Sequence, residues 1–212
     1  QDVNISIAGG ARVEIKGFQE LDKIPELVDN EVSRQISLLE LKEELHKRGF
    51  HEVKDHAKDV TNLFHGTKCN FVRKAIEEGK HVYGLKIEKF SGLFAKQCGD
   101  RTVGKELSVY PASHGFGIIH SDEELSKYHL VEDFATLRKE LNAEEDDLVL
   151  IVVGNNVEKA VYALIKRIDY CLAGVPEETR IADGIGSKYA RPLPGSGRLY
   201  PESDVPAILV TS

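Results

Sequence analysis

The sequence predicts an α+β protein in which a compact domain of strands alternating with helices is flanked by segments of a second domain. Strand-like alternation and helical spacing follow one another over residues 51–173. Residues 1–50 carry the pattern of a β-hairpin followed by one long helix, and the residues from Gly174 onward are rich in proline and glycine. We therefore divide the 212 residues into the ranges 1–50, 51–173 and 174–212.

The first 48 residues predict the hairpin and the long helix. Residues 2–7 and 12–16 alternate polar and apolar side chains, and a glycine-rich turn separates them. Apolar residues recur at helical spacing over 22–48, with Pro25 in the first turn, where proline is tolerated. The apolar stripe is most simply a face that packs against the rest of the protein.

The middle range predicts an alternation of short elements. We expect helices at 68–78, 102–113, 131–141 and 155–172, and strands at 81–87, 116–120 and 148–153. The sequence Ser121-Asp122-Glu123-Glu124 has the form of a capping box and predicts a short helix that begins there. The continuous apolar run 148–153 predicts a central strand covered on both faces. We expect 51–173 to fold as a unit.

The last forty residues predict an irregular segment whose backbone is fixed by prolines and glycines. Its charged residues are of both signs: Arg180, Arg191 and Arg198, with Glu177, Glu178, Glu202 and Asp204. The three arginines could clamp a phosphate, since guanidinium groups bind phosphate in a bidentate manner. The alternative is internal pairing with the four acidic residues, which would pin the loops.

The charge distribution bears on binding partners. A net charge of −7 argues against unspecific nucleic-acid binding. Residues 66–105, however, contain nine Lys/Arg against four Asp/Glu, whereas residues 121–147 contain three against ten. The basic block could face phosphates and the acidic block water or a basic partner, or both could be solvated faces. The candidates for phosphate contact in the basic block are Lys68, Arg73, Lys74 and Lys80.

Composition limits the class of protein. Three widely spaced cysteines predict reduced thiols and a cytoplasmic protein. No apolar run approaches the roughly 20 residues that a membrane-spanning helix needs, and no secretory signal is visible. Histidine and cysteine spacings match no structural-zinc pattern. Because the chain begins at Gln1 within a strand-like run and contains no methionine, we expect it to be a piece of a longer polypeptide.

Three parts of the chain carry a resemblance to a known family. They are Gln1-Asp2-Val3-Asn4-Ile5-Ser6-Ile7, then Gly10-Ala11-Arg12-Val13-Glu14-Ile15-Lys16-Gly17, and the segment from Gly174 to Pro206. Together they resemble the family of E subunits of the archaeal glutamyl-tRNA(Gln) amidotransferase. Residues 90–168 are similar to the insertion domain that this family shares with bacterial-type aspartyl-tRNA synthetases. Leu199 and Ser203 depart mildly from the family pattern, which has Met and Thr there.

The resemblance implies a domain organisation and an activity. It makes 1–50 the end of a catalytic cradle domain, 51–173 the insertion domain and 174–212 the return to the cradle. The implied enzyme is a carbon–nitrogen ligase that phosphorylates the glutamyl side chain of Glu-tRNA(Gln) with ATP and Mg²⁺. Ammonia from the asparaginase-like D-type amidotransferase partner then displaces the phosphate, and Gln-tRNA(Gln) results. The activity needs the complete heteromeric complex, so this piece alone should be inactive.

The resemblance also implies site residues. Asp2 and Glu14 lie on adjacent predicted strands and could reach one Mg²⁺ ion, or Glu14 could simply pair with Lys16 or Arg12. The three arginines of the C-terminal segment could bind ATP phosphates or the tRNA 3′ end, and the four basic candidates of 66–105 could bind tRNA. The alternative function is a tRNA- or partner-binding module without catalytic activity.

Overall fold

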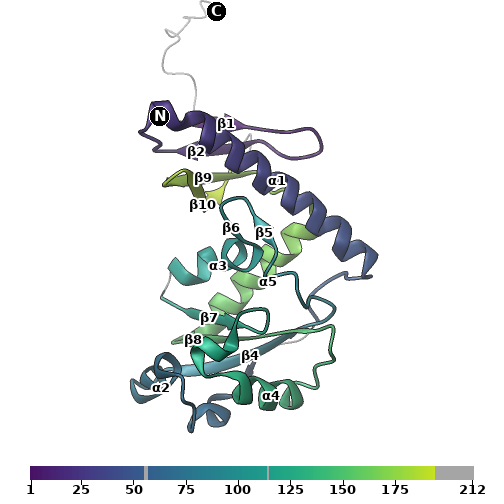
Figure 1. Cartoon of the computed structure of the whole chain (residues 1–212), viewed down its shortest axis with the longest axis vertical. Helices are drawn as coiled ribbons and strands as arrows, with labels where there is room; N and C mark the ends of the chain where they lie inside the picture. Colours follow the sequence, from purple (N-terminus) through teal and green to yellow (C-terminus); the bar gives the residue numbers. More distant parts are fainter. Residues whose placement is uncertain (55–56, 114, 194–212) are drawn as a thin grey trace, which may run out of the picture.

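The computed structural model describes residues 1–54, 57–113 and 115–193. Within these ranges it contains two four-stranded sheets, one two-stranded ribbon and five α-helices, which confirms the α+β class. Figure 1 shows one four-stranded sheet near each end of the long axis, with helices α3 and α5 between them.

The two ends of the described chain meet in one sheet, which we call the terminal sheet. Strands β1 (Val3–Ile5) and β2 (Val13–Lys16) form the predicted antiparallel hairpin. Strands β9 (Glu178–Asp183) and β10 (Gly186–Pro192) form a second hairpin, and β9 pairs in parallel with β2. The order β1-β2-β9-β10 therefore places the C-terminal hairpin directly beside the N-terminal one (Figure 1).

The expectation of an irregular segment after Gly174 is wrong for residues 178–192, which are paired strands. Glu178, Thr179 and Arg180 are buried in succession, and their polar character conceals the strand pattern in the sequence. Their burial is possible because polar partners elsewhere in the fold satisfy them. Residues 194–212, which include Arg198, Glu202 and Asp204, lie outside the described residues.

The central sheet has the order β3-β4-β8-β7, and all of its pairs are antiparallel. Its strands are β3 (Lys58–Asp59), β4 (His81–Ile87), β8 (Leu148–Gly154) and β7 (Gly117–His120). The strand predicted at 81–87 is confirmed, and so is the central place of the apolar run, since β8 lies between β4 and β7 with every residue buried.

Side chains of β8 alternate between two apolar cores. Leu148, Leu150 and Val152 belong to the larger core, whereas the alternate residues, Val149, Ile151 and Val153, belong to the smaller one. Because both faces of the strand are covered, an unbroken apolar run is required where a half-exposed strand would alternate.

Helices cover the two faces of the central sheet. The smaller core includes residues of α2 (Asn70–Glu77) and α4 (Val131–Glu140). The larger core includes residues of α1 (Ile24–Lys47), α3 (Val103–Ser113) and α5 (Val157–Ala173). Each of these helices was expected near its observed position. Figure 1 shows α2 and α4 at the end of the molecule farthest from the terminal sheet.

Helix α1 joins the two parts of the fold. A 3-10 turn at Leu21–Lys23 precedes it, proline stands at its N-terminus as predicted, and Gly49 after its end has a φ of 66°. Its N-terminal half packs on the terminal sheet through Leu27. Its C-terminal half contributes Leu38, Leu41 and Leu45 to the larger core.

The capping-box prediction at Ser121 is wrong, because tertiary contacts occupy the side chains that would cap a helix. Ser121 Oγ accepts a hydrogen bond from the amide of Val149 at 3.1 Å. The Asp122 carboxylate accepts bonds from the amides of Gly92 and Phe94, each at 2.9 Å. A 3-10 turn follows instead at Leu125–Tyr128. Four more short elements were not predicted: strands β3 (Lys58–Asp59), β5 (Gln97–Cys98) and β6 (Arg101–Thr102) and a 3-10 turn at Thr61–Phe64.

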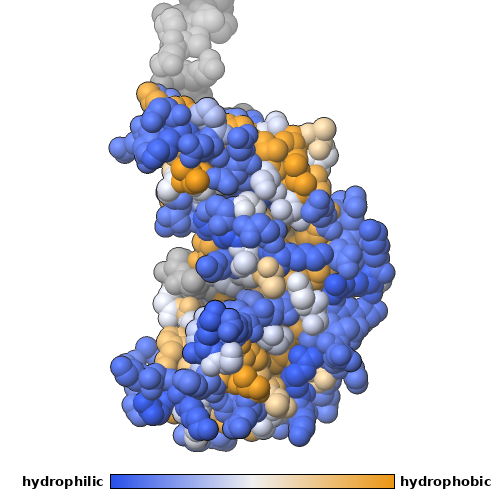
Figure 2. All heavy atoms as spheres, in the orientation of Figure 1, coloured by the Kyte–Doolittle hydropathy of each residue, from blue (hydrophilic) through white to orange (hydrophobic). Residues whose placement is uncertain are grey.

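The polar surface and the unbridged cysteines agree with what the amino-acid composition predicts. Polar residues cover most of the face seen in Figure 2. In the described part of the chain, none of the helices combines the length and the apolar character that crossing a membrane would require. Cys69, Cys98 and Cys171 are buried and unbridged. Burial raises the pKa of Cys98 and of Cys171 to about 12, so both are protonated thiols at neutral pH.

Candidate functional site

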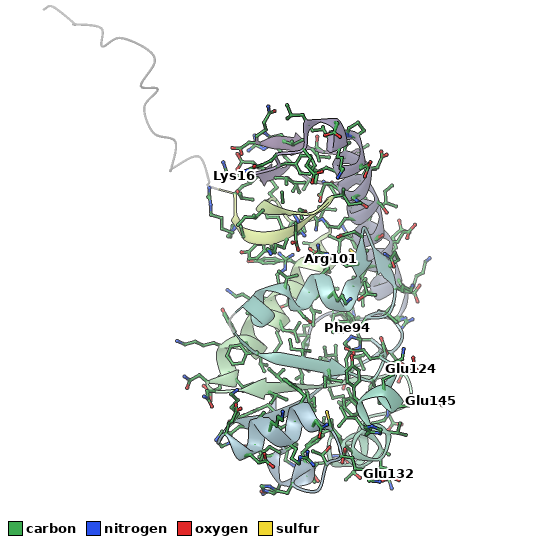
Figure 3. The ribbon with its side chains drawn as sticks, turned by 60° about the vertical axis from the view of Figure 1, so that its left-hand side comes forward. Lys16, Phe94, Arg101, Glu124, Glu132 and Glu145 are labelled. Atoms are coloured by element: carbon green, nitrogen blue, oxygen red, sulfur yellow. The ribbon has the colours of Figure 1, made fainter. Side chains whose placement is uncertain are left out.

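Asp2 and Glu14, the predicted metal ligands, converge on one ammonium group in the terminal sheet. Lys16 Nζ lies 2.8 Å from Asp2 Oδ2 and 3.2 Å from Glu14 Oε1. The hydrogen bond from Lys16 lowers the pKa of Asp2, and the bond to Asp2 raises the pKa of Lys16. The two carboxylates can therefore reach one positive charge, which here is Lys16 of β2. Figure 3 labels Lys16 in the terminal sheet.

Glu14 is the better fixed of the two carboxylates. Its Oε2 accepts a hydrogen bond from Thr179 Oγ1 at 3.1 Å, across the parallel pairing of β2 with β9. Carboxylate oxygens suit a hard cation such as Mg²⁺. Within the described ranges, however, no group of three or more His, Cys, Asp or Glu side chains is arranged to hold a metal ion. This pair fits part of a metal site, and further donors are needed to complete one.

Arg180 does not lie on a loop. It is fully buried in β9, and its guanidinium makes five hydrogen bonds. Two go to Glu106 at 2.7 and 2.9 Å, one to Glu178 at 2.5 Å, and two to the side chain and carbonyl of Ser187 at 2.7 and 2.8 Å. Because arginine has five N–H donors, none is left for a phosphate. The structure thus corrects the phosphate-clamp interpretation of Arg180 and shows the alternative, internal pairing.

Arg180 belongs to a buried group of six charged side chains, which we call the buried ion network. Its members come from four elements: Glu31 and Arg34 of α1, Glu106 of α3, Arg167 of α5, and Glu178 and Arg180 of β9. Each member has at most 6% of its surface exposed. Three positive and three negative charges balance one another, so the network is neutral as a whole.

The shorter distances within the network are those of charge-assisted hydrogen bonds. Arg34 donates to both oxygens of Glu31 at 2.8 Å and to Glu106 at 3.2 Å. Arg167 donates to Glu178 at 2.6 Å and to Glu106 at 3.4 Å. Glu106 therefore accepts from three arginines, which come from α1, α5 and β9.

Neighbouring opposite charges offset the effect of burial on Glu106 and on Arg34. Burial alone would raise the pKa of Glu106, but the charges of Arg180, Arg34 and Arg167 outweigh it and lower the pKa to about 2. Burial alone would likewise lower the pKa of Arg34, but its bonds to Glu31 and the nearby glutamates raise it. Buried charges are costly unless they are paired in this way, so removing one member leaves its partners unbalanced.

The buried ion network was not predicted, although the sequence carries a signal for it. On α1, Glu31 and Arg34 stand at positions where the buried stripe that starts at Leu27 and continues through Leu38 would place apolar residues. On α5, Arg167 follows Leu164 by three residues and lies on the buried face in the same way. A charge at an apolar position of a helical stripe is the feature that could have found these residues.

The other arginines of the C-terminal segment are placed differently. Arg191 is exposed on β10, opposite Thr179 in the ladder. Arg198 lies outside the described residues. Tyr189, on the same strand as Arg191, stacks against the guanidinium of Arg167, whose carbon lies 4.5 Å from the ring centre.

The basic candidates of 66–105 gather around α2, far from the hairpin carboxylates (Figure 1). Lys68, Arg73 and Lys74 are exposed and Lys80 is half-buried. Arg73 donates to Asn70 at 2.6 Å and lies 3.9 Å from Glu77, and Lys80 pairs with Glu78 at 2.8 Å. The acidic block is also a surface feature, since Glu124, Glu132 and Glu145 lie on one side of the molecule in Figure 3.

Comparison with known proteins identifies the family of the chain. The model of the GatB/GatE catalytic domain family matches residues 1–212. The chain belongs to this family. The E subunit of the glutamyl-tRNA(Gln) amidotransferase of Pyrococcus furiosus is 42% identical over all of the chain, and that of Methanococcus maripaludis strain C6 is 44% identical. The corresponding protein of Halobacterium salinarum is 43% identical over 98% of the chain. The chain spans 34–35% of the length of these relatives.

Glu106→Gln should destabilise the protein by about 3–5 kcal/mol, because three arginines lose a buried counter-charge. The folded-state pKa of Glu106 lies below its ordinary value of 4.5. Its contribution is therefore present above pH ~4.5 and lost as the pH falls toward ~2. Urea unfolding at several pH values should show that the variant has lost this part of the pH dependence.

The matched control is Glu124→Gln, which removes a carboxylate paired with Lys127 at the surface. Exposed pairs contribute little, so its unfolding midpoint should stay close to that of the wild type. A Glu106→Gln midpoint equal to that of the control would contradict the assigned role of the network.

Proposed function

We propose that this chain is part of an E-type subunit of glutamyl-tRNA(Gln) amidotransferase. The proposed subunit activates the glutamyl side chain of Glu-tRNA(Gln) with ATP and converts it to Gln-tRNA(Gln). The observation that carries the proposal is identity of 42–44% with such subunits over essentially the whole chain, together with the family match. The geometry adds that the N-terminal hairpin and the described part of the C-terminal segment, strands β9 and β10, come together in one sheet.

The proposed chemistry is activation of a leaving group. A carboxylate does not accept ammonia, whereas an acyl phosphate does, and Mg²⁺ supplies charge compensation when ATP is bound. Asp2 and Glu14 would contribute carboxylate oxygens to the ion, and Thr179 would keep Glu14 in place through its hydrogen bond. Lys16 would balance the charge of both carboxylates before the ion binds. Arg191 and Arg198 stay candidates for phosphate contact.

The proposed partners are those of the complete enzyme. They are an asparaginase-like amidotransferase partner of the D type, which releases ammonia, and tRNA(Gln) charged with glutamate. The relatives are named as E subunits of an amidotransferase, which agrees with a heteromeric assembly. Three buried, unbridged thiols agree with a cytoplasmic site of action.

Glu14→Ala in the full-length protein, assembled with its amidase, should lower the turnover of Glu-tRNA(Gln) by at least about 10- to 100-fold, as loss of a metal-supporting group does. The affinity for tRNA should stay near that of the wild type, because Glu14 is proposed to act on the ion. Single-turnover amidation and filter binding measure the two quantities. Glu20→Ala, an exposed carboxylate close by in sequence, is the control. Reduced tRNA affinity with unchanged turnover would reject the role.

We also propose the domain division 1–50, 51–173 and 174–212, with the middle range as the insertion domain. Expressed alone, 51–173 should unfold cooperatively. It should be less stable than fragment 37–173 by at least about 3 kcal/mol, because the longer fragment adds Leu38, Leu41 and Leu45 of the larger core. Calorimetry or urea unfolding of both fragments tests the boundary, and a non-cooperative transition of 51–173 would reject it.

The basic residues around α2 are proposed to contact tRNA phosphates. Arg73→Ala with Lys74→Ala in the full-length protein should weaken binding equally for different tRNA sequences, since phosphate contacts carry no base information. The slope of log affinity against log salt should fall by about 2, one for each lost contact. Lys127→Ala with Lys139→Ala, in the acidic block, is the control. Unchanged affinity and slope would assign this face to solvent or to the partner protein.

A further inference from the structure

A cleft of about 740 Å³ runs along α5, and the hairpin carboxylates are not among its lining residues. One wall is formed by α5 itself, and Phe116 and Tyr189 of β10 line it from other parts of the chain. Asn155 and Asn156, just before α5, line it as well and offer amide groups that donate and accept hydrogen bonds. The cleft thus lies between residues of the central domain and a strand of the terminal sheet.

The exposed face of α5 alternates lysine and tyrosine. Lys159, Tyr162, Lys166 and Tyr170 follow one another at spacings of three and four residues, so they share one face of the helix. The opposite face carries the apolar stripe that packs in the larger core. Tyr162 is 60% exposed and Tyr170 is 44% exposed. Core packing therefore does not account for these two rings.

Charge in the cleft has one sign. The unburied charges that line it are Lys159 and Lys166, since Arg167 is paired with Glu178 in the buried ion network, and no carboxylate lines it among the residues that the structure describes. This contrasts with the chain as a whole, whose net charge is −7. Lys166 Nζ lies 4.7 Å from the centre of the Tyr162 ring, so the cation and the aromatic surface are already combined.

We propose that this cleft binds an unpaired stretch of RNA, with bases stacked on Tyr162 and Tyr170 and phosphates near Lys159 and Lys166. The inference deepens the proposed function, on which it rests, by assigning unpaired RNA to one surface. Eight residues separate the two tyrosines, which is about 12 Å along a helix. This distance is several times the ~3.4 Å step between stacked bases. The two tyrosines therefore suit a stretch of several nucleotides better than a single nucleotide. A duplex hides its base faces and would use only the lysines.

The test uses the whole 212-residue chain and a fluorescein-labelled 12-nucleotide uridine RNA, followed by fluorescence anisotropy. Tyr162→Ala with Tyr170→Ala should raise the Kd at least tenfold, because each stacked base contributes a factor of this order. Tyr162→Phe with Tyr170→Phe keeps the rings and should bind within about twofold of the wild type. Unchanged Kd in the alanine variant, with its urea midpoint like that of the wild type, would overturn the proposal.

The matched control is Lys127→Gln with Tyr128→Ala. These two exposed residues are adjacent in the sequence and lie outside the cleft, so their substitution should leave the Kd unchanged. Lys159→Gln with Lys166→Gln should lower the salt slope by about 1.4, at ~0.7 for each single-strand phosphate contact. Duplex RNA of the same length should bind the wild type and the tyrosine-to-alanine variant equally. Loss of duplex binding in that variant would overturn the role of base stacking.

Competition separates this site from a nucleotide site. ATP should not displace the RNA; displacement that depends on Tyr162 and Tyr170 would overturn the proposal in favour of a mononucleotide cleft. The binding assay needs neither ATP turnover nor the partner protein. If the chain does not bind the RNA but the full-length enzyme is active in amidation, this inference alone is overturned. If the full-length enzyme has no amidation activity, the proposed function is overturned.

Discussion

The place of the terminal sheet on the rest of the protein depends on the buried ion network. Arg180 of β9, Arg167 of α5 and Arg34 of α1 all donate to Glu106 of α3, a residue 74 positions before Arg180 in the chain. Buried charges are stable only when all of their oppositely charged partners are present, because each charge has lost its contact with water. The network therefore favours one relative arrangement of three helices and one strand.

The network also connects to the candidate metal ligands. Successive side chains of a strand point to opposite faces. Glu178 and Arg180 face the network, while Thr179 between them donates to Glu14. Thus one face of strand β9 holds the Glu14 carboxylate through Thr179. The other face anchors the strand to the buried ion network. In the proposed enzyme, this arrangement would place Glu14 accurately although its strand belongs to a small sheet.

Elements with a clear period could be predicted from the sequence, and elements fixed by distant partners could not. Strand β4 and the central place of β8 follow from local patterns, since apolar spacing alone indicates them. Strand β9 was missed because Glu178 and Arg180 look like exposed loop residues until Glu106 and Arg167 are brought beside them. At the candidate site, the family resemblance pointed to Glu14, but its bond to Thr179 depends on a pairing of strands 165 residues apart.

Hydrogen exchange of Arg180→Met tests most directly whether the network holds the terminal sheet. Methionine keeps an unbranched apolar stem but removes the guanidinium and its five donors, so Glu106 and Glu178 are left with less compensation. Local stability determines amide protection. We expect faster exchange for the amides of β2, β9 and β10, with the protection of β4 and β8 unchanged. Unaltered protection of β9, or an equal loss of protection in both sheets, would contradict it.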